Sequence, residues 1–311
     1  MKKFTRVSDA DDVGALINEA IALKADPFQS DIGRQKTLAM IFLNPSLRTR
    51  MSTQKAAHNL GMDTIVMNMD RDGWKLEFED GAVMDGATVE HIKDAAQVIS
   101  RYCDILAIRS FARFEDREED YSEQVLGQLV EHASVPVVSM ESATRHPLQS
   151  LADLVTIAET GIKQPKIAVT WAPHPKPLPH AVVNSFLEWI RTTDAEVTLT
   201  HPAGYELDEE FSSGVNVTHE QRAALEGADF VYTKSWASYS HYGQHLDVDE
   251  NWTVTAEKMA LTNNGRFMHC LPVRRNVVAE DTVIDDSIVY EQALNRVCSC
   301  QSVLKTILET N

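Results

Sequence analysis

A short polar turn between an apolar run and a helical run holds the residues best suited to chemistry. Residues 37–44 are apolar, the next six read Pro-Ser-Leu-Arg-Thr-Arg, and a helical pattern then continues to Gly61. The start of a helix has unpaired backbone N–H groups and the positive end of the helix dipole, so it suits an anion. Ser46 and Thr49 add hydroxyl donors, and Arg48 adds a planar fork that matches phosphate oxygens. The turn therefore predicts a phosphate site.

This segment lacks the glycine pattern of common nucleotide-binding loops. Neither GxxxxGK[ST] nor GxGxxG occurs in it, and no glycine fingerprint follows any other apolar run, which argues against a dinucleotide-dependent dehydrogenase. An ordinary alternative is a capped helix whose arginines, Arg48 and Arg50, are exposed to solvent. A short motif leaves both interpretations open.

Polar side chains, most of them cationic or able to become so, follow six apolar runs. They are Ser46, Arg48 and Thr49; Arg109; Glu141, Arg145 and His146; His174 and Lys176; Lys234; and His269, Cys270 and Arg274. In open α/β sheets, ligands bind beyond the carboxyl ends of the strands. Because the chain carries a net charge of −17, this gathering of basic groups predicts a focused anion pocket. Each residue alone has an ordinary alternative, such as a surface arginine, a helix cap or a solvated lysine.

Strand-like runs alternate with helical patterns along most of the chain. Strands are expected near 37–44, 63–69, 104–110, 135–140, 166–172, 195–200, 229–233 and 266–270. Helices are expected near 49–60, 89–102, 121–132, 147–160, 179–192, 219–226 and 255–261. This alternation indicates βαβ units, and the nearly continuous apolar runs fit parallel strands that are covered on both faces.

Eight strands are many for one sheet, so the sequence favours an α/β fold with two doubly wound parallel-sheet domains. The first domain is predicted over residues 1–145 and the second over 146–290. A helix that opens at Pro147 would bridge them. The last helix would return to the first domain, which then also includes residues 291–311.

Composition is that of an ordinary globular protein. The 311 residues are 43% hydrophobic and 24% charged, and the net charge of −17 argues against nucleic acid or an anionic membrane as a partner. No apolar run approaches the roughly 20 residues that span a bilayer. The N-terminus turns acidic before any apolar stretch, unlike a secretory signal.

The four cysteines form no CxxC pair and no disulfide framework. They are Cys103, Cys270, Cys298 and Cys300. A reducing cytoplasm is therefore the expected location. Cys298 and Cys300 fall in a helical pattern, where packing is favoured over a metal or redox role.

Three motifs together resemble a known family. SLRTR after a strand, HPLQSLADLVTI at the start of a bridging helix and HCLP after a late strand resemble the aspartate/ornithine carbamoyltransferase superfamily in their order and spacing. Further segments are similar to its N-acylornithine branch, the N-acetylornithine and N-succinylornithine carbamoyltransferases. These are FLNPSLRTR, WKLE, VMDG, EHI, RSFARF, TWAPHPKPLP, VYTKSW and MALTNNGRFMHCLPVRRN. The Ser-Met-Gly loop of ordinary ornithine carbamoyltransferases is replaced by KSWASYSHYGQHL.

The resemblance implies a homotrimer of two-domain subunits, with active sites shared between subunits and a backbone knot in the second domain. It also implies a reaction in arginine biosynthesis between two small molecules, carbamoyl phosphate and an N-acylornithine. The uncharged δ-amine attacks the carbonyl carbon and phosphate leaves. No metal and no cofactor is required.

The resemblance also assigns roles to individual residues. Carbamoyl phosphate would contact Ser46, Leu47, Arg48, Thr49, Arg109, His146, Gln149, Cys270, Leu271, Arg296 and, from a neighbouring subunit, Trp74. Among these, Arg109, His146 and Thr49 would contact the carbamoyl oxygen, while the backbone carbonyls of Cys270 and Leu271 would accept hydrogen bonds from the NH2 group. Whether the Cys270 thiol assists proton transfer or is only structural is left open. The acylornithine would contact Glu141, His174, Lys234, Arg274, Val89 and, on weaker grounds, Asn184.

Val89 decides between the two acyl groups. Three residues after VMDG, acetyl enzymes of this branch carry a glutamate and known succinyl enzymes a proline, whereas this chain has Val89. A glutamate would repel the extra carboxylate of a succinyl group, and valine removes that repulsion. The residue therefore favours N-succinyl-L-ornithine, although a valine at the start of a helical pattern could simply pack.

Two rivals remain. One is an N-acetylornithine carbamoyltransferase. The other is a non-catalytic anion-binding or assembly subunit of the same fold, against which the intact set of Arg48, Thr49, Arg109, His146 and Cys270-Leu271-Pro272 speaks.

Overall fold

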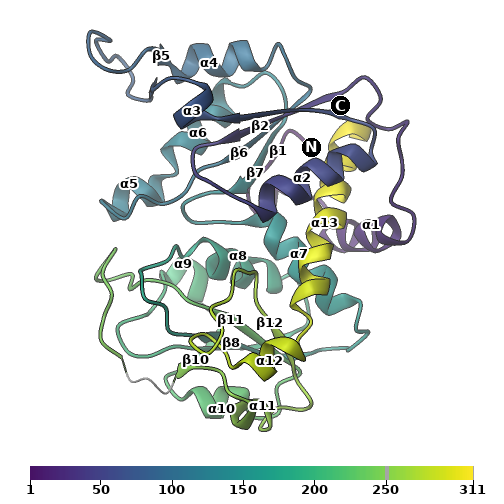
Figure 1. The fold of residues 1–311 in the computed structure, drawn as a ribbon, viewed down its shortest axis with the longest axis vertical. Coiled ribbons are helices and arrows are strands. Elements are labelled where there is room, and N and C mark those ends of the chain that lie inside the picture. The colour runs from purple at the N-terminus through teal and green to yellow at the C-terminus, as the bar shows by residue number, and fades with distance from the viewer. Residues whose placement is uncertain (249–251, 311) are drawn as a thin grey trace.

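A computed structural model gives the protein two α/β units joined by helices (Figure 1). The structure describes residues 1–248 and 252–310, so residues 249–251 of the predicted second domain and residue 311 of the returning segment lie outside it. Each unit contains a five-stranded sheet in which every neighbouring pair is parallel. The predicted α/β fold with two doubly wound sheets is confirmed.

The first sheet has the order β1-β7-β6-β2-β3. Its strands are β1 (Lys3–Phe4), β2 (Thr37–Phe42), β3 (Asp63–Asn68), β6 (Ile105–Arg109) and β7 (Val137–Glu141). The helices of this unit are α1 (Val13–Ala25), α2 (Arg48–Asn59), α3 (Met69–Asp72), α4 (Ile92–Ile99), α5 (Arg117–Ser122) and α6 (Gln124–His132). A small pair, β4 (Leu76–Glu77) and β5 (Glu90–His91), extends from one end of the unit (Figure 1).

The second sheet has the order β10-β9-β8-β11-β12. Its strands are β8 (Lys166–Trp171), β9 (Glu196–Thr200), β10 (Asn216–Thr218), β11 (Phe230–Lys234) and β12 (Arg266–Met268). The helices of this unit are α8 (Ala181–Ile190), α9 (Glu209–Ser212), α10 (Gln221–Leu225), α11 (Ala256–Met259) and α12 (Asp281–Asp285).

Two long helices connect the units (Figure 1). Helix α7 (Pro147–Ala158) begins with a proline at its first turn, where no N–H is needed, and is buried over almost its whole length. Helix α13 (Val289–Thr310) returns to pack against α1, α2 and α7. Buried polar bonds fix this return, among them Asn59 Nδ2 to Gln301 Oε1 at 3.0 Å. The two helices thereby hold the carboxyl ends of both sheets toward one another.

All eight predicted strands are present within a few residues of their expected positions. The outer strands β1 and β10 were not predicted, because two or three residues carry no measurable periodicity. The helix expected over 121–132 is divided at Glu123, whose backbone is left-handed with φ of 53°. The knot stays a prediction.

An aromatic contact also joins the units near α5. The Tyr121 hydroxyl lies 3.0 Å from Nδ1 of His180, and Nε2 of His180 donates to the Ala237 carbonyl at 2.7 Å. Burial lowers the pKa of His180 from 6.5 to about 4. This histidine is therefore neutral in the folded protein over the pH range in which it protonates in the unfolded chain.

Acid should destabilise the protein partly through His180. Between pH 6.5 and 4 the unfolded state binds the extra proton, so stability falls as pH falls, by about 3 kcal/mol in total from a pKa of about 4 against 6.5. The variant H180Q keeps an amide donor but cannot titrate, and its urea unfolding free energy should fall less steeply between pH 7 and 5. The matched control is H58Q, at an exposed histidine away from this contact, which reports the effect of a histidine-to-glutamine change by itself. Equal slopes for H180Q and wild type would contradict the expectation.

Candidate active site

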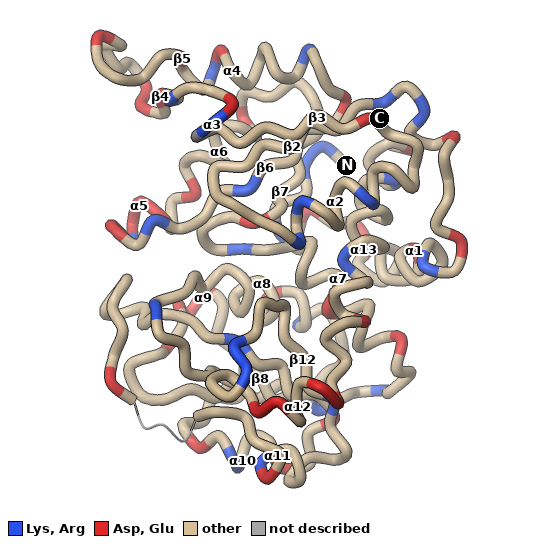
Figure 2. Tube along the Cα trace, in the orientation of Figure 1, with Lys and Arg blue, Asp and Glu red and all other residues tan. Residues whose placement is uncertain are grey.

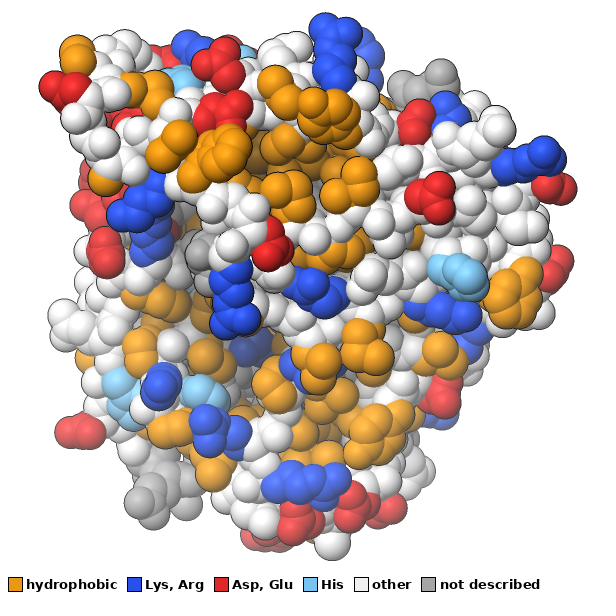
Figure 3. Space-filling model, turned by 45° about the horizontal axis from the view of Figure 1, so that its top comes forward, with side chains coloured by type: hydrophobic (Ala, Val, Ile, Leu, Met, Phe, Trp, Pro, Cys, Tyr) orange, Lys and Arg blue, Asp and Glu red, His pale blue; other side chains and the backbone are white. Residues whose placement is uncertain are grey.

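A cavity of about 350 Å³ lies between the two units, where the carboxyl ends of the two sheets face each other. Its lining comes from the segments that follow β2, β6, β7, β8, β11 and the last strand, together with α7, α8 and α13. Figure 3 shows Lys and Arg side chains around the hollow between the units, and Figure 2 shows that both units carry Lys and Arg positions along the chain. The predicted convergence of strand ends on one pocket is confirmed. The predicted residues that line it are Ser46, Leu47, Arg48, Thr49, Arg109, Glu141, His146, Gln149, His174, Lys234, Cys270, Leu271 and Arg296.

The start of α2 forms one wall of this cavity. No side chain caps the helix at Leu47, so the first N–H groups of α2 keep their capacity to bind an anion. Nη2 of Arg296, from α13, donates to Oγ1 of the buried Thr49 at 2.8 Å. Nε of Arg48 is buried and has no partner among the described residues. The guanidinium groups of Arg48 and Arg296 and the uncapped N-terminus of α2 therefore lie at the same cavity. Together they provide the donors and positive charge that a phosphate group needs.

Arg109 and Glu141 form a buried ion pair at the centre of the cavity. Nε and Nη2 of Arg109 each lie 3.0 Å from Oε2 of Glu141, while Nη1 donates to the carbonyls of Asn44 and Pro45. A guanidinium has five N–H donors, so this arrangement leaves one on Nη2 for a ligand. Burial raises the pKa of Glu141, and the charge of Arg109 opposes that shift.

His146 lies beside this pair, at the start of α7. Its Nε2 is 3.7 Å from Oε2 of Glu141, and its Nδ1 is buried without a partner among the described residues. Burial, reinforced by the charges of Arg296 and Arg109, lowers the pKa of His146 well below 6.5. A neutral imidazole in this position can donate an N–H to a carbonyl oxygen without adding a charge.

The second unit contributes a further basic group of side chains. Nε of Arg274 donates to Nε2 of His174 at 3.0 Å, and the buried Lys234 donates from Nζ to the Ser235 carbonyl at 3.0 Å. Burial lowers the pKa of His174, which favours its role as an acceptor from Arg274. Arg274 does not itself line the cavity but reaches its rim through His174. This side of the cavity suits carboxylates.

The Cys270 thiol is poorly placed to accept a proton. Burial raises the pKa of Cys270, and nearby Asp153 and Glu141 oppose the thiolate as well. The protonated form therefore dominates at neutral pH. Cys270 and Leu271 line the cavity, and the carbonyl role predicted for them needs no thiolate.

Three predicted residues lie away from this cavity within the single chain. Trp74 and Val89 are 54% and 64% exposed, in the segment that projects beyond the first sheet (Figure 1). The Trp74 indole donates to Oε2 of Glu90 at 2.9 Å. Asn184 is fully buried on α8 and does not line the cavity, since the face of α8 that does so presents Val182. The predicted contact of Asn184 with the acylornithine stays a prediction.

Arg145 was expected at the rim but is used in packing. It pairs through Nε with Oε1 of Glu188 at 3.2 Å and through Nη2 with Glu210, which ties its loop to α8 and α9.

The apolar part of the cavity, Phe111, Leu178, Pro179 and Val182, was not predicted. Phe111 follows a strand end two residues after Arg109, and its ring centroid lies 4.0 Å from the Arg109 guanidinium. Leu178 and Pro179 fall in the segment TWAPHPKPLP, which indicated the family but not a contact with the cavity.

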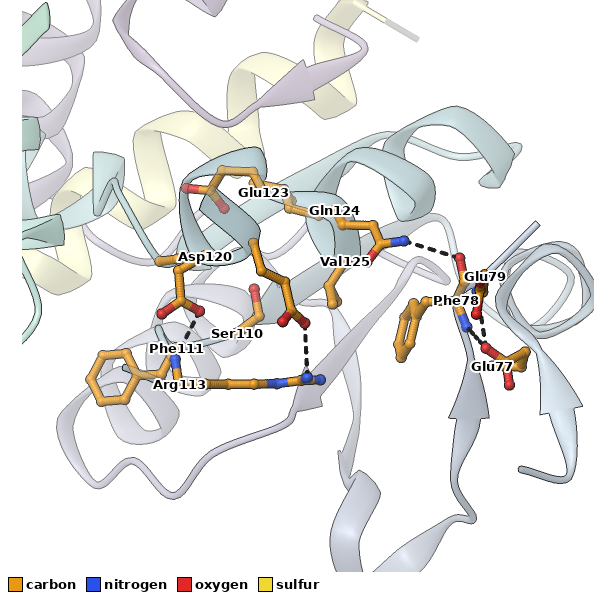
Figure 4. Close-up of a pocket in the computed structure, with 13 residues that line it drawn as sticks. Glu77, Phe78, Glu79, Ser110, Phe111, Arg113, Asp120, Glu123, Gln124 and Val125 are labelled. Carbon is orange, nitrogen blue, oxygen red and sulfur yellow. Dashed lines mark hydrogen bonds and ion pairs between the residues drawn. The ribbon is translucent and has the colours of Figure 1, made fainter. Parts of the chain in front are cut away.

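A second cavity, of about 470 Å³, is larger but chemically satisfied (Figure 4). Nη1 of Arg113 pairs with Oε1 of Glu119 at 3.0 Å, and the Asp120 carboxylate accepts from the backbone N–H groups of Arg113 and Phe114. Glu77 accepts from the backbone N–H groups of Phe78 and Glu79. Four charged side chains of this lining, Glu77, Arg113, Glu119 and Asp120, therefore have partners within the chain.

Within residues 1–248 and 252–310, no group of three or more histidine, cysteine or carboxylate side chains is placed to hold a metal ion. Over the same residues, no helix combines the length and apolar character needed to cross a membrane.

Two family models match almost the whole chain. Residues 2–159 match the carbamoyl-P binding domain of aspartate/ornithine carbamoyltransferase, and residues 179–307 match its Asp/Orn binding domain. The chain belongs to the aspartate/ornithine carbamoyltransferase family. It is therefore a transferase of carbamoyl groups.

Relatives within the carbamoyltransferase family agree with the predicted branch. The N-succinylornithine carbamoyltransferase of Bacteroides fragilis (strain 638R) is 54% identical over 315 residues, covering 99% of each chain. The N-acetylornithine carbamoyltransferase of Xanthomonas campestris pv. campestris is 36% identical, covering 99% of this chain and 98% of its own. Among solved structures, a glutamate-to-valine mutant of N-acetyl-L-ornithine transcarbamylase, complexed with carbamyl phosphate and N-succinyl-L-norvaline, matches with a TM-score of 0.94 and 36% identity, covering 99% of this chain and all of its own.

Proposed function

We propose that this chain transfers the carbamoyl group of carbamoyl phosphate to the δ-amine of N-succinyl-L-ornithine, giving N-succinyl-L-citrulline and phosphate in arginine biosynthesis. The observation that carries the proposal is the shared cavity, in which the uncapped start of α2 faces the basic side chains of the second unit. Carbamoyl phosphate needs a phosphate site, and N-succinyl-L-ornithine has carboxylates that basic side chains can pair with. The higher identity to the succinyl enzyme than to the acetyl enzyme supports the same choice.

The reaction needs positioning and oriented charge. The neutral amine attacks the carbonyl carbon, a C–N bond forms, the C–O bond to phosphate breaks, and the amine loses one proton to the departing phosphate or to solvent. Arg48, Thr49 and Arg296 would hold the phosphate, while the free N–H of Arg109 and the neutral His146 donate to the carbamoyl oxygen. Donors fixed in a buried site stabilise the negative charge that develops on this oxygen without reorganising.

The roles proposed for Trp74 and Val89 require a second copy of the chain. Figure 3 shows apolar side chains gathered on one face of the first unit. The large apolar side chains exposed on this unit include Leu47, Met51, Ile65, Trp74, Val83, Met84 and Val89. A contiguous exposed apolar patch often marks a protein interface. We infer a homotrimer in which Trp74 and Val89 of one subunit complete the cavity of the next.

The domain division and location follow the same proposal. Residues 1–145 with 291–311 would form the carbamoyl phosphate domain, and 146–290 the acylornithine domain, because each division contains one complete sheet. The cytoplasm is the proposed location, where four unpaired cysteines are stable.

Val89 supports the succinyl assignment. In the solved mutant described above, the change from glutamate to valine accompanies a bound N-succinyl ligand. By the family resemblance, Val89 stands where acetyl enzymes of this branch carry a glutamate, so the chain would have the residue type of that mutant. An uncharged side chain here leaves the succinyl carboxylate free of repulsion.

A direct assay tests the proposal. Ureido product would be measured with carbamoyl phosphate and ornithine, N-acetyl-L-ornithine or N-succinyl-L-ornithine in parallel. We expect the highest kcat/KM with the succinyl compound. Preference for the acetyl compound would overturn the interpretation of Val89, and no product with any amine would favour a non-catalytic anion-binding subunit.

A further inference from the structure

A buried carboxylate lies just behind the cavity and has no place in the mechanism given above. Asp153 is on α7, one turn after Gln149, and is fully buried. Its Oδ1 accepts from Nε2 of Gln149 at 2.8 Å and from Nε2 of Gln292 at 2.7 Å, and its Oδ2 accepts from the Tyr232 hydroxyl at 2.8 Å. We call these four residues the Asp153 cluster. It joins α7, α13 and β11 at a single carboxylate.

The cluster determines which way the Gln149 amide faces. A carboxylate can only accept hydrogen bonds, so the nitrogen of Gln149 must point toward Asp153. Its oxygen then points the other way. Gln149 lines the cavity, and its Oε1 is buried with no partner among the described residues. An unpaired buried acceptor is costly unless a ligand supplies a donor.

The same constraint acts on Gln292. Because Nε2 of Gln292 donates to Asp153, its Oε1 is left to accept from the backbone N–H of His269 at 2.9 Å. His269 directly precedes Cys270 and Leu271, which line the cavity. Asp153 therefore orients the Gln149 amide and, through Gln292, holds the backbone that directly precedes Cys270 and Leu271.

Packing alone gives no reason for a carboxylate here. Among the residues that the structure describes, no lysine or arginine forms an ion pair with Asp153, and burial raises its pKa from 3.8 to about 6. Burying a carboxylate without an ion pair is unfavourable, and an apolar side chain of similar volume is often neutral or stabilising in such a place. The unfavourable burial indicates that the acceptor character of Asp153 serves the cavity.

We propose that Asp153 is a positioning residue that holds the Gln149 amide with its oxygen toward the carbamoyl NH2 group, so that the site selects a carbamoyl group over an acyl group that has a methyl in place of NH2. The inference builds on the proposed function, because it assumes that carbamoyl phosphate binds in this cavity. Only the NH2 group can donate to Oε1 of Gln149; a methyl group would leave that oxygen unpaired.

Two stable phosphonates test this selectivity directly. Phosphonoacetamide and 2-oxopropylphosphonate differ only in NH2 against CH3, and their dissociation constants can be measured by calorimetry on the full-length protein. Wild type should bind the amide at least about tenfold more tightly than the ketone. The variant D153A should lose most of this ratio, by about tenfold, while its affinity for the ketone changes less than about threefold.

Three further variants separate positioning from simple structural support. D153N keeps an Oδ1 acceptor for both glutamines and should preserve the ratio. Y232F removes only the bond to Oδ2 and should preserve it too. D153L fills the space of the side chain and replaces D153A if that variant does not fold; it should lose the ratio in the same way.

Each outcome has a separate meaning. A ratio that survives in D153A or D153L overturns the inference, as does a parallel loss of affinity for both phosphonates, which would show a structural role. Wild type that binds neither phosphonate would instead overturn the proposed function.

Discussion

Replacing Arg109 with alanine is expected to lower kcat for carbamoyl transfer by at least about a hundredfold, which is the usual effect of removing a donor to a developing oxyanion. Arg109 is 5% exposed and is bound on three sides, by Glu141 and by the carbonyls of Asn44 and Pro45. Its remaining N–H is therefore fixed before substrate arrives. Such a donor stabilises the transition state more than the ground state, so kcat should fall more than the affinity for carbamoyl phosphate.

Two variants complete this experiment. R109K keeps the charge but loses the planar fork, so it should recover only a small part of the activity. The matched control is R113A, because Arg113 lies four residues later, pairs with Glu119 at the surface and lines only the other cavity. R113A should retain wild-type kcat. Wild-type turnover in a folded R109A protein, checked by circular dichroism and gel filtration, would place the chemistry elsewhere.

The sequence predicts well which strand ends meet at the cavity between the units, because the carboxyl ends of parallel strands lie at one edge of a sheet. Arg109, Glu141 and Lys234 end three buried strands, and all three line the cavity. Their convergence follows from local pattern and a general property of α/β folds. The first helix, α1, was not predicted, although the sequence holds a signal for its start. Asp12 is a favoured type of capping residue, and in the structure its side chain accepts from the Ala15 N–H at 2.9 Å.

Other features depend on contacts that no local pattern encodes. Arg145 pairs with Glu188 and Glu210, which are distant from it in sequence. Because no local pattern indicates these partners, Arg145 was interpreted as one of the basic residues that line the pocket. The Asp153 cluster likewise depends on Gln292, 139 residues away. Sequence periodicity reports burial, but it does not report which buried polar groups meet.

Replacing Val89 with glutamate is expected to lower kcat/KM for N-succinyl-L-ornithine by about ten- to a hundredfold and to change the value for N-acetyl-L-ornithine much less. A carboxylate within a few ångströms of the succinyl carboxylate, in a partly desolvated site, would repel it by roughly one to several kcal/mol. Val89 is 64% exposed in the single chain, so the change should not disturb folding. The matched control is V89Q, which has the size of glutamate without its charge and should keep the succinyl preference. Equal loss in V89Q and V89E would show that volume decides.

Mixing two inactive variants can show which subunit Val89 serves. In a trimer assembled from V89E and R109A chains, some cavities belong to a V89E chain and receive residue 89 from a neighbouring R109A chain. Such a cavity has an intact Arg109 from its own chain and a native Val89 from the neighbour. Random assembly would produce such sites at about a quarter of all positions, since each neighbour is drawn independently in a closed ring. Activity with N-succinyl-L-ornithine should therefore reappear after the variants are co-refolded, although each alone is deficient. If Val89 acted within its own chain, every mixed site would carry one of the two defects and no activity would return.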